Sequence, residues 1–233
     1  MGASVTVLSL MAILTIGDGG SGGAQGTPQL DERARIHSAR AEDAVLRSLE
    51  KAGQVLKTMR ADFVETKVLV LLNDKQETRG DVTLQVPGRL RWNYTSPQPS
   101  VMMIKDGAFA RYIPKSKQVF RGAARGEADL LVGFGPGAAG LGKKYEVTLV
   151  GKETVGGAPA WVLDLKPRAD EASGLFSAIR LWVDEGRSIP VQTRLTEPTG
   201  DHTTIRFEKV VVNRALPAGA FDLRLPKDVV EVK

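Results

Sequence analysis

The sequence predicts an α+β fold, a curled and incomplete antiparallel β-barrel of about eleven strands with one main helix. Segments with alternating apolar and polar residues recur at hairpin spacing from residue 61 to residue 212. A single amphipathic segment precedes them. Such a sheet has a concave face that side chains fill, a helix caps or a ligand occupies, and the residue pattern leaves these three possibilities open.

The composition fits a turn-rich β protein and excludes several kinds of site. Of the 233 residues, 42% are hydrophobic, enough to bury a core, and 25 glycines and 12 prolines supply turns. The absence of cysteine from the sequence excludes disulfides, thiolate metal sites and a thiol nucleophile. The formal charge of +5 comes from basic residues that are interleaved with acids along the chain. We therefore expect no nucleic-acid partner.

The first part of the chain has the pattern of a secretory signal peptide. Residues 5–16 form an apolar run that is too short for a bilayer span, which needs about 20 residues. Small residues follow, and Gly22-Gly23-Ala24 fits a cleavage site, although no Lys or Arg precedes the run. We expect a signal over residues 1–24, a flexible linker over 25–37 and one domain over 38–233. The alternative for the first segment is a disordered tail.

Residues 38–59 show the spacing of an amphipathic helix. Val45, Leu49, Ala52, Leu56 and Met59 recur every three or four residues, and charged or amide side chains occupy the opposite positions. A helix with one apolar face needs an apolar partner, and we expect the sheet to be that partner. The alternative is a helix on a membrane surface, which the mixture of acids and bases on its polar face makes the less favoured one.

About eleven segments with strand composition follow, separated by turn signals such as Asn73-Asp74, Pro87-Gly88 and Thr199-Gly200. The expected strands are residues 61–72, 76–86, 89–95, 100–105, 108–113, 117–121, 144–151, 159–167, 177–185, 189–197 and 201–212. The short connections predict antiparallel pairing.

Residues 80–112 contain the hairpins around which the rest of the sheet is organised. One strand alternates strictly, with Leu90, Trp92 and Tyr94 on one face. Met102 and Ile104 alternate in the same way on the next strand. Core packing and the lining of a ligand cavity both explain this apolar face, and periodicity does not separate them.

No group of residues has the composition of a catalytic site. Residues 135–140 match G-x-G-x-x-G by letter, but the dinucleotide fingerprint requires a preceding strand and a following helix, and here strands follow. We interpret this segment as a loop after a short helix at 127–132. Around His37 and His202, the two histidines, no nucleophile, base and orienting group converge. We therefore expect no enzyme activity, no cofactor and no metal site.

Several short motifs occur in a fixed order through the chain. They are Ala61-Asp62-Phe63-Val64-Glu65, Gln85-Val86-Pro87-Gly88, Leu90, Arg91-Trp92, Tyr94, Pro97, Asp106-Gly107, Tyr112-Ile113-Pro114, Gln118-Val119, Leu216-Pro217, Phe221, Leu223 and Pro226. In their order and spacing they resemble the periplasmic outer-membrane lipoprotein carrier family, LolA. The resemblance runs from Ala44 to the C-terminus.

The resemblance implies an unclosed barrel with a helical lid over a cavity that takes acyl chains. It places these side chains on the cavity wall: Phe63, Leu90, Trp92, Tyr94, Met102 and Ile104. The implied function is a monomeric periplasmic carrier that binds lipoprotein acyl chains and transfers them toward the outer membrane. The implied partners are an ATP-driven extractor complex of the inner membrane and an acceptor at the outer membrane.

Two positions depart from the family pattern. The family has an arginine before the proline of the turn, and its hydrogen bonds to the lid backbone help to hold the empty cavity shut. Here the residue is Val86, which cannot donate those bonds, so we expect a less tightly closed lid. Arg89 and Arg91 should point away from the cavity. Ala110 replaces an aromatic residue, which predicts a less aromatic pocket.

An alternative is a regulatory sensor of the same fold. Proteins that resemble the periplasmic sigma-factor regulator RseB share this half-barrel and bind a lipid or a signalling partner. They carry a second domain, for which we expect no room after Leu216.

Overall fold

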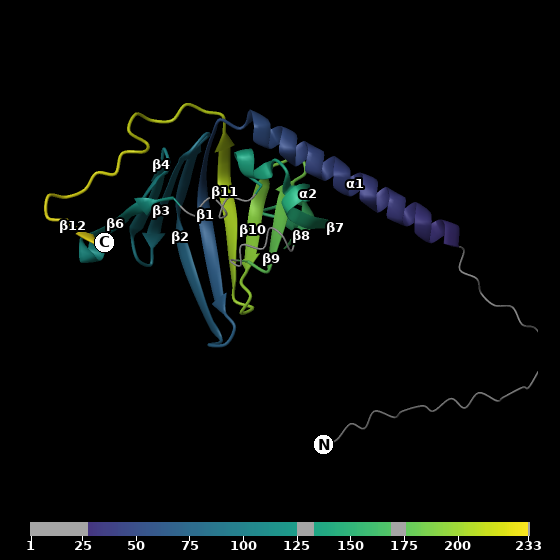
Figure 1. Cartoon of the computed structure of the whole chain (residues 1–233), viewed down its shortest axis with the longest axis horizontal. Coiled ribbons are helices and arrows are strands. Elements are labelled where there is room, and N and C mark those ends of the chain that lie inside the picture. Colours follow the sequence, from purple (N-terminus) through teal and green to yellow (C-terminus); the bar gives the residue numbers. More distant parts are fainter. Residues whose placement is uncertain (1–27, 125–132, 169–175, 233) are drawn as a thin grey trace, which may run out of the picture.

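The structure is a computed structural model, and it describes residues 28–124, 133–168 and 176–232. One curled sheet and one long helix dominate this part of the chain, and the helix crosses one end of the sheet (Figure 1). The predicted fold class is confirmed, because the described strands form a single twelve-stranded sheet whose two outermost strands do not pair with each other. The barrel is therefore unclosed. No helix in these three stretches is both long and apolar enough to span a membrane.

The elements keep the order that the sequence predicts. The helices are α1 (Pro28–Val55), η1 (Pro114–Ser116), η3 (Gly135–Ala138) and α2 (Leu141–Lys144). The strands are β1 (Thr58–Leu69), β2 (Asp74–Gln85), β3 (Arg89–Ser96), β4 (Ser100–Lys105), β5 (Ala108–Ile113), β6 (Gln118–Ala123), β7 (Tyr145–Val155), β8 (Ala158–Pro167), β9 (Ala178–Asp184), β10 (Pro190–Thr196), β11 (His202–Val212) and β12 (Val230–Val232). The helix expected at 127–132 lies outside the described residues.

The strand order is β12-β6-β5-β4-β3-β2-β1-β11-β10-β9-β8-β7. Neighbours are antiparallel, apart from β12, which pairs parallel to β6. Strand β12 was not predicted, because its three residues are too few to show a periodicity. The pairing of β1 with β11 sets Phe63 opposite Phe207 and joins the two halves of the sheet.

Helix α1 begins earlier and ends earlier than expected. It starts at Pro28, so residues 28–37 are helical rather than a flexible linker. These residues include good helix formers such as Glu, Arg and Ala, but they have no apolar repeat, because this end of the helix projects past the sheet (Figure 1). The helix ends at Val55, and Met59 belongs to β1 instead. Its buried side chain shares one face of that strand with Ala61 and Phe63.

The face of the sheet that α1 covers is here called the inner face. Two apolar clusters fill it. Under α1, Val45 and Leu49 pack with Leu163, Leu181 and other side chains of β8 to β10. The second cluster lies on β1 to β4 and β11 and consists of Leu56, Met59, Ala61, Phe63, Val82, Leu84, Leu90, Trp92, Met102, Ile104, Phe134, Ile205 and Phe207; it is called the aromatic cluster below.

A short segment completes the cover of the inner face. This lid, residues 133–144, contains η3 and α2 and packs against α1 at Gly53. A Cβ at Gly53 would lie 2.5 Å from the carbonyl oxygen of Gly135 and 2.7 Å from the Cβ of Ala138. Only glycine allows this close approach. The G-x-G-x-x-G letters thus belong to a 3-10 turn of the lid, followed by a four-residue helix and a strand, and not to a nucleotide-binding βαβ unit.

The opposite, outer face of β3 to β5 carries the chain segment after β11. Phe221 is buried there, in a hollow that it shares with Met103 and Ala110. Ala110 pairs with Met103 across β4 and β5, so it lies on the outer face. The expectation that Ala110 makes the pocket less aromatic is therefore wrong, because this residue does not face the inner side.

Candidate functional site

The structure brings the six predicted wall residues together on the inner face. The cross-strand register aligns Leu90 with Ile104 and Trp92 with Met102, and Phe63 lies opposite Gly80, the partner of Tyr94. Five of the six are buried, and Tyr94 is half-buried at the edge. Their common location is as predicted, and their role as the wall of a cavity stays a prediction.

Aromatic side chains form the centre of the aromatic cluster. The Phe63 ring lies 4.9 Å from the Trp92 ring and 5.5 Å from the Tyr94 ring, the latter edge-on. The Phe207 ring lies 6.2 Å from Trp92 and 5.2 Å from Phe134 of the lid. Edge-to-face contacts of this kind add to the apolar burial. The rings connect the sheet directly to its lid.

Sequence reasoning missed three residues of this arrangement. Phe207 and buried Ile205 alternate on β11. This alternation is visible in the sequence, but it does not show whether the two side chains lie on the inner or the outer face of the sheet. Phe134 lies in a glycine-rich loop without any periodicity. Gly80 has no side chain of its own, and a Cβ there would lie 2.8 Å from the Phe63 ring. It makes room for that ring.

Val86 lies where the turn between β2 and β3 meets the lid. Its side chain packs against the aromatic cluster, and its Cγ2 would be 3.0 Å from a Cβ built on Gly135. Its backbone N–H donates to the carbonyl of Lys57 at 2.8 Å. The contact with the lid at this position is therefore apolar.

The two nearby arginines do not replace the missing donor. Arg89 forms an ion pair with Asp106, with Nε 3.2 Å from Oδ1, and Arg91 donates to the backbone carbonyl of Asp222 at 3.2 Å. Both are occupied on the outer face, as their alternation with Leu90 predicts.

Four hollows border the described residues, and none of the six predicted wall residues lines any of these four. Ala61 and Val82 of the aromatic cluster border one of them, and Phe207 borders another. The one beside β1, β2 and the segment after β11 measures about 620 Å³ and is lined by both acidic and basic residues. Because five of the six predicted wall residues are buried, a ligand could reach them only if the residues that cover them moved.

A polar group borders the aromatic cluster on the side away from the lid. Glu65 follows Phe63 on the same face of β1, and burial raises the pKa of its carboxyl group, while the charges of Lys67 and Arg111 partly offset that shift. The pKa of Tyr94 is also raised, first by burial and then by the charge of Glu65. The inner face thus changes from apolar to polar along β1.

One buried donor in the aromatic cluster has no acceptor. The indole Nε1 of Trp92 is inaccessible and makes no hydrogen bond to any described residue, whereas Nε1 of Trp182 donates to Glu153 at 2.8 Å. An unpaired buried donor typically costs about 1–3 kcal/mol.

The part of the chain that the structure describes shows no cluster of metal-binding side chains. Its Asp, Glu and His side chains nowhere gather in threes that could hold a metal ion. His202 begins β11, and its Nδ1 lies 3.5 Å from the carbonyl oxygen of Gly200 in the preceding turn.

Comparisons with known proteins agree with this geometry. The family model described as outer membrane lipoprotein carrier protein LolA matches residues 54–224, which include β1 to β11 and the whole aromatic cluster. The outer-membrane lipoprotein carrier protein of Chromobacterium violaceum is 30% identical over 178 residues, which cover 74% of this chain and 80% of that protein. The protein of the same name from Azotobacter vinelandii is 27% identical and covers 79% of this chain and 88% of its own length.

Solved structures share the fold at low sequence identity. Lipoprotein LppX of Mycobacterium tuberculosis has a TM-score of 0.52 at 14% identity, covering 76% of this chain and 98% of its own. MucB has a TM-score of 0.53 at 18% identity, covering 79% of this chain and 63% of its own. These similarities concern the fold alone. Because the family model spans nearly all of the sheet, and the carriers align over most of their length, the chain belongs to the LolA family of outer-membrane lipoprotein carriers.

Proposed function

We propose that this protein carries the acyl chains of lipoproteins across the periplasm, toward the outer membrane, with the aromatic cluster as the binding surface. The observation that carries the proposal is the aromatic cluster itself. It joins five strands into one apolar surface, and the lid that covers it contributes Phe134 to the cluster and meets Val86 of the turn between β2 and β3. Moving the lid would expose this surface without breaking the sheet.

The energetics of acyl chains determine which partners such a carrier needs. Each buried methylene is worth about 0.8 kcal/mol, so an acyl chain does not cross water unprotected. A chain that leaves a bilayer for an equally apolar cavity gains almost nothing. Loading therefore needs an energy source, for which we propose an ATP-driven extractor complex of the inner membrane, and unloading needs an outer-membrane acceptor.

The carrier works in the periplasm as a monomer. Residues 1–24 act as a signal peptide that directs export. No bond is made or broken during transfer, in keeping with the apolar character of the inner face. The likeness to MucB is one of fold and gives no separate support to the regulatory alternative.

Native mass spectrometry of the protein purified from the periplasm tests the proposal. We expect part of the protein to carry additional mass that matches acylated lipoprotein or its lipid portion. Deletion of residues 1–24 should leave the protein in the cytoplasm without this cargo. A periplasmic protein that never co-purifies with acylated material, even when its outer-membrane acceptor is depleted, would contradict the carrier function.

A further inference from the structure

The hairpin between β1 and β2 ends in three exposed apolar residues. Leu71 is 86% exposed, Leu72 is 73% exposed and Val70 is 51% exposed. Their segment was expected to continue the strand to residue 72, but β1 ends at Leu69 and the three residues form the turn. Consecutive exposed apolar residues are unfavourable in water unless they serve a function.

The tip is built to hold these side chains outward. The backbone N–H of Asn73 donates to the carbonyl of Val70 at 3.2 Å, and Asn73 has a positive φ of 47° that closes the turn. The backbone N–H of Val70 donates to the carboxylate of Asp201, at 2.8 Å, in the turn between β10 and β11. The tip is thus anchored to a second hairpin, and it extends farther from the body of the sheet than the other hairpins do (Figure 1).

The size and shape of the tip fit a lipid surface better than a protein partner. A stable protein interface usually takes about 20–30 residues a side, on surfaces that match over a broad area. Three consecutive side chains at the end of a projecting hairpin cannot supply that area. They can enter the boundary between head groups and acyl chains, where apolar side chains leave water without any complementary surface.

The charges around the tip are balanced. Asp74 and Lys75, of opposite charge, directly follow the turn, and Lys67 pairs with Glu197 at 3.3 Å. Attraction to anionic head groups therefore contributes little, and the apolar residues supply the binding.

We propose that Val70, Leu71 and Leu72 insert into the surface of a lipid bilayer, so that the carrier delivers or collects acyl chains while it touches the membrane. This inference rests on the proposed function for its purpose, but the insertion itself does not depend on cargo. Phe63, at the centre of the aromatic cluster, lies seven residues before Val70 on the same hairpin, a distance of about 23 Å along an extended chain. Insertion would bring the polar end of the inner face next to the head groups.

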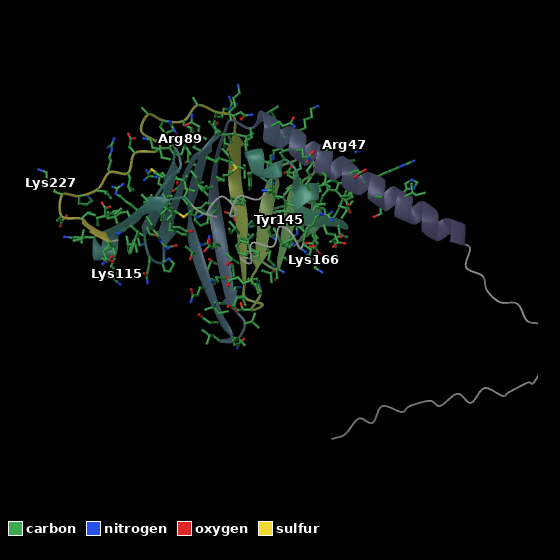
Figure 2. All side chains as sticks on the ribbon, viewed as in Figure 1. Arg47, Arg89, Lys115, Tyr145, Lys166 and Lys227 are labelled. Carbon is green, nitrogen blue, oxygen red and sulfur yellow. The ribbon has the colours of Figure 1, made fainter. Side chains whose placement is uncertain are left out.

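The absence of cysteine from the sequence makes a direct test simple. In Leu72→Cys, an environment-sensitive dye on the new thiol should shift to the blue when vesicles of neutral phosphatidylcholine are added. Brominated acyl chains should quench it, and raising the salt concentration should change neither effect. The control is the same dye in Lys115→Cys, an exposed position next to β6 at another end of the molecule (Figure 2), which should not respond.

The rate of fatty-acid transfer tests whether membrane contact through the tip promotes delivery. The rate at which a fluorescent fatty acid leaves the loaded protein for vesicles should rise with vesicle concentration, because contact is required. Leu71→Asn combined with Leu72→Asn should lower that rate at least about tenfold. The free energy of burying one leucine side chain exceeds the free energy that corresponds to a tenfold change in an equilibrium or a rate. Affinity for the fatty acid should stay unchanged. Val150→Asn, which alters a single exposed residue on β7, should behave like the parent.

Each outcome decides the proposal. A dye at position 72 that ignores vesicles, or a transfer rate that the double substitution leaves unchanged, overturns it. A dye that responds to protein concentration without vesicles would show that the tip binds a second copy of this chain, and it would overturn the membrane assignment too. If no variant binds fatty acid, the carrier function fails, and the dye response still decides whether the tip enters the bilayer.

Discussion

Val86 and Gly135 meet at the contact between the turn of β2 and β3 and the lid, where a Cβ on Gly135 would lie 3.0 Å from Val86 Cγ2. The LolA resemblance places an arginine at this position and assigns it hydrogen bonds to the lid. Here an apolar contact takes their place, because Arg89 and Arg91 are both bonded on the outer face. The closed state therefore depends on packing between the lid and the aromatic cluster.

The substitution Val86→Arg should close the lid more tightly. A guanidinium beside the lid can donate hydrogen bonds to its backbone, which valine cannot do. We expect slower uptake and slower release of a fluorescent fatty acid in stopped-flow measurements. Val86→Leu, which adds bulk without donors, should keep the parent rates. Unchanged rates in Val86→Arg would show that this turn does not control the lid.

The substitution Gly53→Ala should loosen the lid from the opposite side. The added methyl would lie 2.5 Å from the Gly135 carbonyl oxygen, so α1 and the lid must separate. We expect a loss of about 1–3 kcal/mol in unfolding free energy and faster uptake of the fatty acid.

Gly142→Ala is the matched control for this change. Gly142 has open space around its Cβ position and lies in α2, so alanine there should keep or slightly raise stability, by up to about 1 kcal/mol. Equal effects of the two substitutions on uptake would contradict the role of the contact between Gly53 and the lid.

The substitution Leu90→Glu separates a cavity wall from a sealed core. Leu90 is 3% exposed with the lid closed. If the lid opens, the carboxylate can stay hydrated, so we expect a folded protein that no longer binds fatty acid. Leu163→Glu, in the cluster under α1, should unfold the protein, because an unpaired buried carboxylate removes much of a stability of about 5–15 kcal/mol. Thermal melting measures whether Leu90→Glu folds, and probe binding measures whether it still takes up the fatty acid. A variant that does not fold, or one that binds like the parent, would contradict the cavity assignment of Leu90.

The carboxyl group of Glu65 should make stability depend on pH. Burial raises its pKa above the ordinary 4.5, so the folded state holds the proton more tightly than the unfolded chain does. Its contribution is most favourable below pH 4.5 and is lost as the pH rises through the raised pKa. Glu65→Gln should therefore raise the melting temperature at pH 7 to 8 relative to the parent, and the difference should vanish near pH 4.5.

Local periodicity was enough to predict most of the sheet. The alternation of Leu90, Trp92 and Tyr94, with turn residues on either side, predicts both the strand and the face that becomes buried, because the pleat allows only two sides. The family motifs lie in these same hairpins. For that reason the common location of the six residues was predicted before any contact between them was known, while their role as the wall of a cavity stays a prediction.

Contacts between distant parts of the chain were decided only by the tertiary structure. Phe134 and Phe207 join Trp92 across more than forty residues of sequence, and no short-range pattern records such a meeting. The same limit applies to Val70, Leu71 and Leu72, which were expected to continue the strand to residue 72. The sequence makes these side chains apolar. The strands beside them end at this turn, so nothing in the described fold covers them. Burial is a property of what packs against a residue, and that partner is chosen by the fold as a whole.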